Sequence, residues 1–194
     1  MAKKGVLTKA DYLPYEEYKA VLNKLHEDGK YRDELYFIVA FSTALRISDI
    51  LSLRWEDILG KDRITKTEQK TGKTRMIRMN TAVQNKIAEL YGLLRSPRKS
   101  YFLFKDNAIS PITSQAINKR LKAIRDKYNL SITNFSSHTF RKTFGRYVYE
   151  KKGKTEESLL LLCSILNHSN PSVTKRYIGL RDDEINSVFD EIEF

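Results

Sequence analysis

The chain has 194 residues, of which 41% are hydrophobic, and a formal net charge of +11 with a pI near 9.6. No apolar run approaches the roughly 20 residues that cross a bilayer, and the N-terminus lacks the apolar stretch of a secretory signal. We therefore expect a cytoplasmic protein that is not held in a membrane. The excess of positive charge predicts a polyanionic partner, with nucleic acid ahead of an acidic membrane surface.

The charge is unevenly distributed along the chain. Residues 181–194 carry one arginine and six acidic side chains, a net charge of −5, so the rest of the chain carries +16. A basic body with an acidic tail indicates that the tail does not face the polyanion.

Apolar side chains recur at helical spacing along most of the chain and predict a mainly α fold. Gly29 is expected to end the first helix, and Thr81 to cap the third. The apolar residues between positions 185 and 192 follow the same spacing and predict an amphipathic helix over residues 183–193. The other predicted helices cover Tyr18–Leu25, Leu35–Phe41, Val83–Leu94, Ile117–Tyr128 and Phe140–Val148.

One segment has the alternation of a β-hairpin instead. Arg63–Thr67 and Thr74–Met79 are short and β-prone, and Gly72 between them lets the chain turn. Phe102–Phe104 is expected to add a short strand. The predicted class is therefore mainly α with a small antiparallel β-sheet.

Residues 45–49, Leu-Arg-Ile-Ser-Asp, place Arg46 just before an expected helix start that Ser48 could cap. An arginine in this position can bind a phosphate, or it can be a surface side chain that pairs with Asp49. Taken alone, the stretch favours the surface ion pair.

His138 and Arg141 are three residues apart and would share one helix face. Together they could transfer protons and bind an oxyanion, although the spacing is common. His168 could equally be a histidine at the end of an apolar helix, where the helix dipole favours it. Tyr177 is one of 11 tyrosines and Lys70 one of many lysines, so neither stands out by itself.

The order and spacing of these residues resemble the tyrosine recombinase family, which includes phage integrases, chromosome-dimer resolvases and single-domain DNA invertases. Residues 45–49 resemble its first arginine box, and Ser137–Arg141 its His-x-x-Arg box. Lys142 stands where a second histidine often follows that box. The resemblance covers about residues 7–180.

Three further matches complete the resemblance. Lys70 falls at the position of the family's hairpin lysine. Leu166–His168 resembles its Leu-Gly-His motif, with Asn167 in place of glycine, and asparagine also tolerates a left-handed helix end. Tyr177 follows His168 by nine residues, which is the family's spacing to its nucleophile.

The resemblance implies a site-specific recombinase that cleaves and rejoins DNA through a 3′-phosphotyrosine intermediate, with integration, excision or inversion as the result. Tyr177 would be the nucleophile, Lys70 the acid that protonates the leaving 5′ oxygen, and Asp49 a support for the arginine box. No metal or other cofactor is implied. The expected phosphate ligands are Arg46, His138, Arg141 and His168, and the expected DNA contacts of the hairpin are Lys66, Lys73 and Arg75.

The implied partner is double-stranded DNA, on which a homotetramer would assemble from chains that are monomers when unbound. We expect a short basic segment at residues 1–14, a catalytic domain at 15–180 and a C-terminal helix within 181–194. That helix either passes to a neighbouring subunit or folds back on its own domain. Two alternatives remain, a relaxing topoisomerase with the same chemistry and a catalytically inactive DNA-binding regulator.

Overall fold

The computed structural model describes residues 10–105 and 110–192, with only the backbone described at positions 181, 182, 184 and 185. The chain divides into two compact units, the N-terminal unit (Met1–Arg141) and the C-terminal unit (Lys142–Phe194). Among the described residues, no helix combines the length and the apolar character that crossing a membrane requires.

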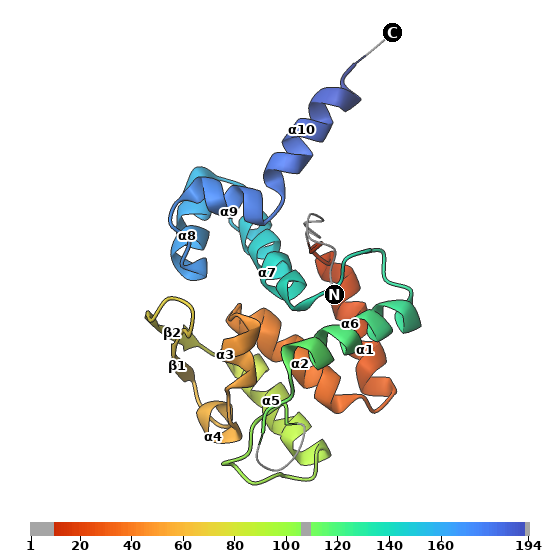
Figure 1. Cartoon of the computed structure of the whole chain (residues 1–194), viewed down its shortest axis with the longest axis vertical. Helices are drawn as coiled ribbons and strands as arrows, with labels where there is room; N and C mark the ends of the chain where they lie inside the picture. The colour runs from red at the N-terminus through yellow and green to blue at the C-terminus, as the bar shows by residue number, and fades with distance from the viewer. Residues whose placement is uncertain (1–9, 106–109, 193–194) are drawn as a thin grey trace. The chain divides into compact units, whose positions relative to one another are not determined.

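Helix α2 is the central helix of the N-terminal unit (Figure 1). It packs against α1, α3 and α5, and every residue from Glu34 to Ala40 is buried. A helix that is covered on all sides in this way belongs to the core of its unit. The elements of the unit are α1 (Tyr15–Glu27), α2 (Tyr31–Thr43), α3 (Ile47–Leu51), α4 (Trp55–Ile58), β1 (Arg63–Thr67), β2 (Thr74–Arg78), α5 (Thr81–Leu93), α6 (Ser114–Tyr128) and the start of α7 (Ser137–Lys151).

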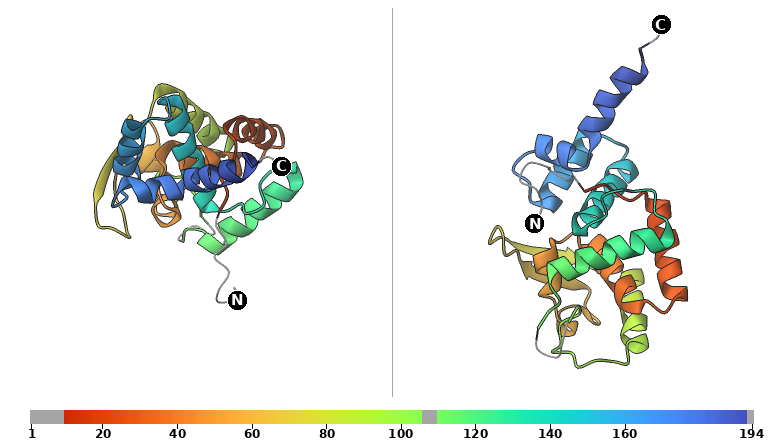
Figure 2. Two further views of the ribbon diagram at one scale, coloured as in Figure 1. Left: turned by 90° about the horizontal axis from the view of Figure 1, so that it is seen from above. Right: turned by 45° about the vertical axis from the view of Figure 1, so that its right-hand side comes forward.

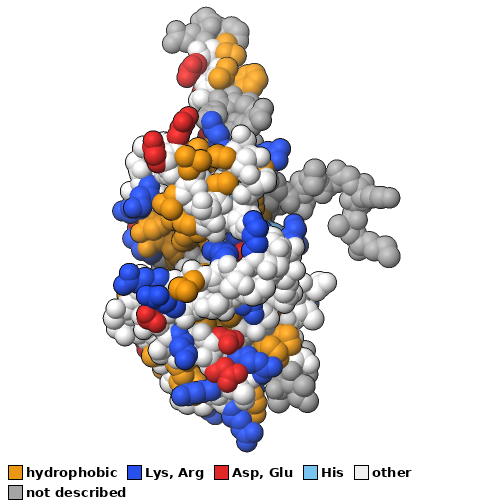
Figure 3. Space-filling model, turned by 90° about the vertical axis from the view of Figure 1, so that its left-hand side faces the viewer, with side chains coloured by type: hydrophobic (Ala, Val, Ile, Leu, Met, Phe, Trp, Pro, Cys, Tyr) orange, Lys and Arg blue, Asp and Glu red, His pale blue; other side chains and the backbone are white. Residues whose placement is uncertain are grey.

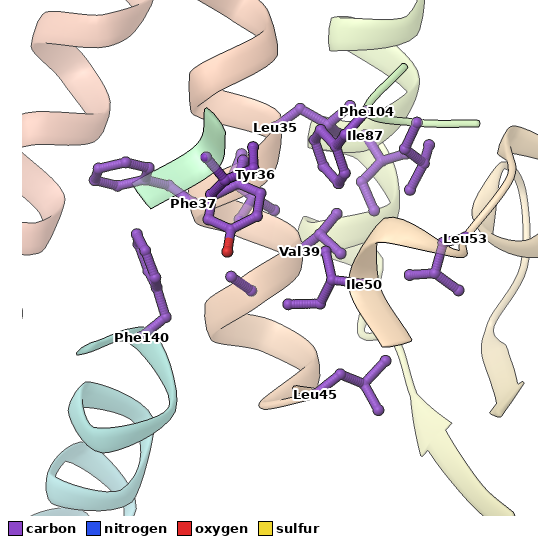
Figure 4. Packing of buried hydrophobic residues seen from close by; sticks show 14 of the residues in the cluster. Leu35, Tyr36, Phe37, Val39, Leu45, Ile50, Leu53, Ile87, Phe104 and Phe140 are labelled. Carbon is purple, nitrogen blue, oxygen red and sulfur yellow. The ribbon is translucent and has the colours of Figure 1, made fainter. Parts of the chain in front are cut away.

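An aromatic cluster joins α7 to α2. Figure 4 shows Phe140 of α7 next to Phe37 of α2, and their ring centroids are 4.7 Å apart at an interplanar angle of 73°. Phe135 meets the Phe37 ring edge-on at 5.8 Å. Contacts of this kind add about 0.5–1.5 kcal/mol each beyond the burial of apolar area. They hold the first turns of α7, which carry His138 and Arg141.

The predicted hairpin is confirmed to within one residue. β1 and β2 are antiparallel, in a register that pairs Arg63 with Arg78 and Thr67 with Thr74. Ile64 and Ile77 are directly opposite each other and buried, so this pair ties the hairpin to the core. Figures 1 and 2 show the hairpin at an edge of the N-terminal unit.

Two predictions about local structure are wrong. Phe102–Phe104 forms no strand, because Phe102 makes only an isolated bridge to Arg54. Helix α5 is capped by Asn80, whose side chain accepts a hydrogen bond from the backbone N–H of Val83 at 2.9 Å, so Thr81 is the first helical residue. Asparagine caps helices at least as well as threonine, so Asn80, one position before Thr81, is the cap.

The C-terminal unit consists of the end of α7, followed by α8 (Glu156–Leu166), α9 (Pro171–Tyr177) and α10 (Leu180–Asp190). Helix α9 packs against both α8 and α10. The predicted tail helix is confirmed, although it runs from Leu180 to Asp190 rather than over residues 183–193. Val188 and Phe189 on this helix are exposed, and the side chain of Ile185 lies outside the described residues.

We expect Phe37→Ala to lower the free energy of unfolding by about 3–5 kcal/mol, because it removes a fully buried ring and leaves a cavity between α2 and α7. The matched control is Met76→Ala on β2, where the side chain is 66% exposed and the change should cost less than about 0.5 kcal/mol. Urea denaturation of both variants measures the difference. Equal stabilities for the two variants would show that the aromatic cluster does not hold α7.

Candidate active site

The candidate site begins with the turn that follows α2. Helix α2 ends at Thr43, and Ala44 takes a left-handed conformation with φ 47°. This conformation costs an L-residue roughly 1 kcal/mol, and it lets the chain turn sharply and enter α3. Arg46 is the N-cap of α3, with no side-chain cap, so the prediction that Ser48 caps this helix is wrong. Ser48 lies within α3.

Arg141 reaches the same turn from α7. Its side chain is buried, and its Nη1 donates a hydrogen bond to the backbone carbonyl of Ala44. Arg141 and Ala44 are 97 residues apart in the sequence. The bond between them therefore brings the two arginine motifs together at the residues that precede Arg46. His138 lies one turn before Arg141 on α7 and is exposed.

Arg46 pairs with Glu68, the first residue after β1, and not with Asp49. The Nη1 atom of Arg46 donates to the carboxylate of Glu68, and only 18% of the Arg46 side chain is exposed. The surface ion pair with Asp49 that the local sequence favoured is therefore wrong. Asp49 is fully buried, and its Oδ1 accepts a hydrogen bond from the backbone N–H of Gln69 at 2.9 Å.

The basic residues of the hairpin divide into two groups. Lys70 and Lys73 are exposed in the loop between the strands, and Lys66 is half-buried on β1. Arg75 forms the second group, because its side chain is largely buried. Its Nη1 donates to Glu68 at 3.1 Å, and only 14% of the side chain is exposed. On the face of the molecule drawn in Figure 3, lysine and arginine side chains gather over this hairpin.

His168 and Tyr177 are brought together within the C-terminal unit. Asn167 ends α8 with a left-handed φ of 51°, as the sequence predicted. His168 follows, and its Nδ1 lies 3.0 Å from the hydroxyl oxygen of Thr174. The rings of His168 and Tyr177 meet edge-on, with centroids 5.0 Å apart. Asn170 caps α9 and accepts from the N–H of Val173 at 3.0 Å, which fixes the helix that ends at Tyr177.

Two basic residues of α7 contact the chain at Tyr177 and at the residue that follows it. The ammonium group of Lys142 lies 5.7 Å from the centroid of the Tyr177 ring. Arg146 is buried, and its Nε donates to the carbonyl of Ile178 at 2.6 Å, while its Nη2 pairs with the carboxylate of Asp183. Arg146 thus ties α7 both to the residue after Tyr177 and to α10.

Sequence reasoning missed Glu68 and Arg146. A single acidic residue among the lysines and arginines of the hairpin was the available signal for Glu68. Arg146 lies on α7 five residues after Arg141, with no motif around it, and no sequence signal distinguishes it from the other arginines.

Comparisons with known proteins agree with this arrangement. The chain matches the phage integrase family over residues 11–184. It is 34% identical to the probable integrase/recombinase YoeC of Bacillus subtilis (strain 168) over an alignment of 178 residues that covers 87% of this chain and 92% of that protein. It is 25% identical to tyrosine recombinase XerC of Staphylococcus carnosus (strain TM300) over 93% of this chain, and it spans 62% of the length of that relative.

Solved structures share the fold at low sequence identity. XerA recombinase is similar with a TM-score of 0.70 and 19% identity, over 94% of this chain and 66% of that chain. XerH recombinase, solved as a post-cleavage complex with its difH substrate, has a TM-score of 0.69 and 19% identity, over 95% of this chain and 54% of that chain. Since the family matches nearly the whole chain and YoeC is related along almost all of its own length, the chain belongs to the phage integrase family of tyrosine recombinases.

Proposed function

We propose that this chain is a site-specific recombinase that cuts and rejoins double-stranded DNA through a covalent bond between a phosphate and Tyr177. The observation that carries the proposal is the meeting of Arg46 and Arg141 at one turn, with their side chains largely removed from water. Two arginines anchored at one turn would offer two positive charges and several N–H donors to the oxygens of one phosphate.

The chemistry of a phosphodiester explains why such a site would be useful. A phosphodiester is anionic and repels nucleophiles, so its cleavage needs cations on the two nonbridging oxygens. Arg46 and Arg141 would bind these oxygens and stabilise the additional charge of the pentacoordinate transition state. His138 and His168 would donate hydrogen bonds to the same phosphate.

The cleavage step exchanges one phosphoester bond for another. The hydroxyl oxygen of Tyr177 attacks phosphorus and its proton passes to solvent by way of His138. The bond between phosphorus and the 5′ oxygen breaks, and Lys70 protonates the leaving oxygen. The product is a 3′-phosphotyrosine and a 5′-hydroxyl. Attack by a 5′-hydroxyl reverses the step, so rejoining consumes no nucleotide. The proposal requires that the residues of both units reach one phosphate when DNA is bound.

The two alternatives differ from this proposal in measurable ways. A relaxing topoisomerase would remove supercoils without joining two sites, and a catalytically inactive regulator would bind DNA without forming a covalent complex. The retention of His168 against Tyr177, together with two largely buried arginines, supports an active enzyme over a regulator. We further propose that the enzyme works in the cytoplasm and that the domain limits are those expected from the sequence.

We expect Tyr177→Phe to abolish the covalent complex with a nicked DNA substrate and to leave DNA affinity within about threefold of the original, since phosphate contacts across the whole surface supply the affinity. Tyr149→Phe is the matched control, because it removes a hydroxyl from the same unit, one that donates to the Lys154 carbonyl. A denaturing gel detects the complex. A Tyr177→Phe variant that still forms it would show that another residue is the nucleophile.

We expect Arg141→Lys to lower the single-turnover cleavage rate by roughly a hundredfold or more, because lysine keeps the charge but not the planar fork. Arg120→Lys on α6 is the control, since that arginine is half exposed and pairs with Asp33 at the surface. Circular dichroism checks that both variants are folded. Cleavage by folded Arg141→Lys at a rate close to the original would remove Arg141 from the phosphate site.

We also propose that the chain assembles into a tetramer on DNA by passing α10 to a neighbouring subunit. The support is the exposure of apolar side chains on the C-terminal unit, at Val188 and Phe189 of α10 and at Leu160 and Leu161 of α8. On the face shown in Figure 3, hydrophobic side chains gather over α8. An exposed apolar stripe on one element and an apolar patch on another allow a head-to-tail contact that can close a ring.

We expect Phe189→Asp to leave formation of the covalent complex intact and to lower recombination between two sites by roughly tenfold or more, because a charge would enter the proposed contact. The matched control, Asn186→Asp, adds the same charge at another exposed position of α10 and should recombine normally. Native gels of the protein on DNA measure the assembly. Normal assembly of Phe189→Asp would contradict the exchange of this helix.

A further inference from the structure

A buried carboxylate connects the two parts of the candidate site that lie in the N-terminal unit. The side chain of Glu68 is 0% exposed, although every other charged side chain of the hairpin is basic. Its Oε2 accepts from Arg46 and, at 2.9 Å, from the hydroxyl of Thr71, while its Oε1 accepts from Arg75 at 3.1 Å. A carboxylate without water needs such partners, because an isolated buried charge costs several kcal/mol.

The backbone of Glu68 closes the loop that carries Lys70. Its N–H donates to the carbonyl of Lys73 at 3.0 Å, and its carbonyl accepts from the N–H of Gly72 at 2.9 Å. Asp49 holds the next residue, since its Oδ1 accepts from the N–H of Gln69. The loop is thus attached at its first two residues to the turn and helix that carry Arg46.

The charges in this cluster leave part of Arg46 available for a ligand. Glu68 carries one negative charge against the two positive charges of Arg46 and Arg75, so these three side chains together keep one positive charge. The contact with Glu68 is made by Nη1 of Arg46, and a guanidinium has five N–H donors. Glu68 can therefore orient Arg46 while other donors of the same group bind a phosphate.

We propose that Glu68 is a positioning residue, whose buried carboxylate sets the Arg46 guanidinium and the Lys70 loop in place together. The proposal rests on the function proposed above. Glu68 itself would touch neither the phosphate nor the leaving oxygen. Its effect is geometric: Arg46 would stabilise the transition state and Lys70 would protonate the leaving group, and both depend on one carboxylate for their placement.

The test uses Glu68→Gln in the full chain, which keeps the shape of the side chain and removes its charge. The matched control is Glu56→Gln, which changes the net charge equally at an exposed side chain of α4. The cleavage site is first identified by selecting, from random DNA, the duplexes that the unmodified chain captures covalently. The substrate is a nicked duplex that carries this site. It is made in two forms, with an ordinary phosphate and with sulfur in place of the 5′ bridging oxygen. A thiolate leaves without prior protonation, so the sulfur form bypasses Lys70.

We expect Glu68→Gln to bind DNA normally and to cleave the ordinary substrate about 10- to 100-fold more slowly, because small misplacements of catalytic groups have effects of this size. The sulfur substrate should restore part of this loss, because it bypasses the need for Lys70 but not the need for Arg46. Lys70→Ala and Arg46→Lys serve as references. The sulfur substrate should restore the cleavage rate of Lys70→Ala fully and that of Arg46→Lys not at all.

Several outcomes would overturn the proposal. Cleavage by folded Glu68→Gln at the original rate removes any positioning role, and full restoration or no restoration by sulfur shows that Glu68 serves only one of the two residues. If Glu68→Gln fails to fold, Thr71→Val replaces it, since it removes one donor to the carboxylate from an exposed position. That variant should cleave several-fold more slowly, and an unchanged rate overturns the proposal. If the unmodified chain captures no random DNA covalently, the proposed function itself has failed, and this proposal fails with it.

Discussion

A carboxylate that is shut away from water has to be balanced by positive charge, and in this protein Glu68 meets that requirement with Arg46 and Arg75. Breaking a buried ion pair by removing one partner costs about 3–5 kcal/mol, because the other charge is left uncompensated. The three side chains therefore hold each other in place. Since Arg46 belongs to the turn after α2, and Glu68 and Arg75 belong to the hairpin, this balance sets where the hairpin lies against the helices of the N-terminal unit.

The turn at Ala44 depends on a second arginine. Ala44 has a left-handed backbone that an alanine adopts at some cost, and its carbonyl accepts a hydrogen bond from Arg141. A buried carbonyl that a charged donor satisfies is worth roughly 1.5–3 kcal/mol, which is enough to offset the strained backbone. The aromatic contact between Phe37 and Phe140 supports this bond, because it packs the helix that carries Arg141 onto α2.

In the C-terminal unit, the surroundings of Tyr177 combine rigid and adaptable features. Asn167, Asn170 and Pro171 determine where α8 ends and α9 begins, so the ring contact between His168 and Tyr177 follows from short-range structure. Beyond Tyr177 the chain is held by Arg146, through the carbonyl of Ile178 and the carboxylate of Asp183. A shift of α10 would act on this arginine first, and through it on the residue next to Tyr177.

The sequence by itself determined the mainly α class, the hairpin, the left-handed end of α8 at Asn167 and the family, because short-range spacing and turn chemistry carry these features. It did not determine the partner of Arg46, which local reasoning placed at Asp49 and the structure places at Glu68. It also missed the bond from Arg141 to Ala44 and the roles of Glu68 and Arg146. The reason is physical. An ion pair, or a hydrogen bond from a side chain to a distant carbonyl, depends on which groups the fold removes from water together. The partners of Arg46, Arg141 and Arg146 lie 22, 97 and 32 positions away in the sequence, so each pair comes together only when the helices pack.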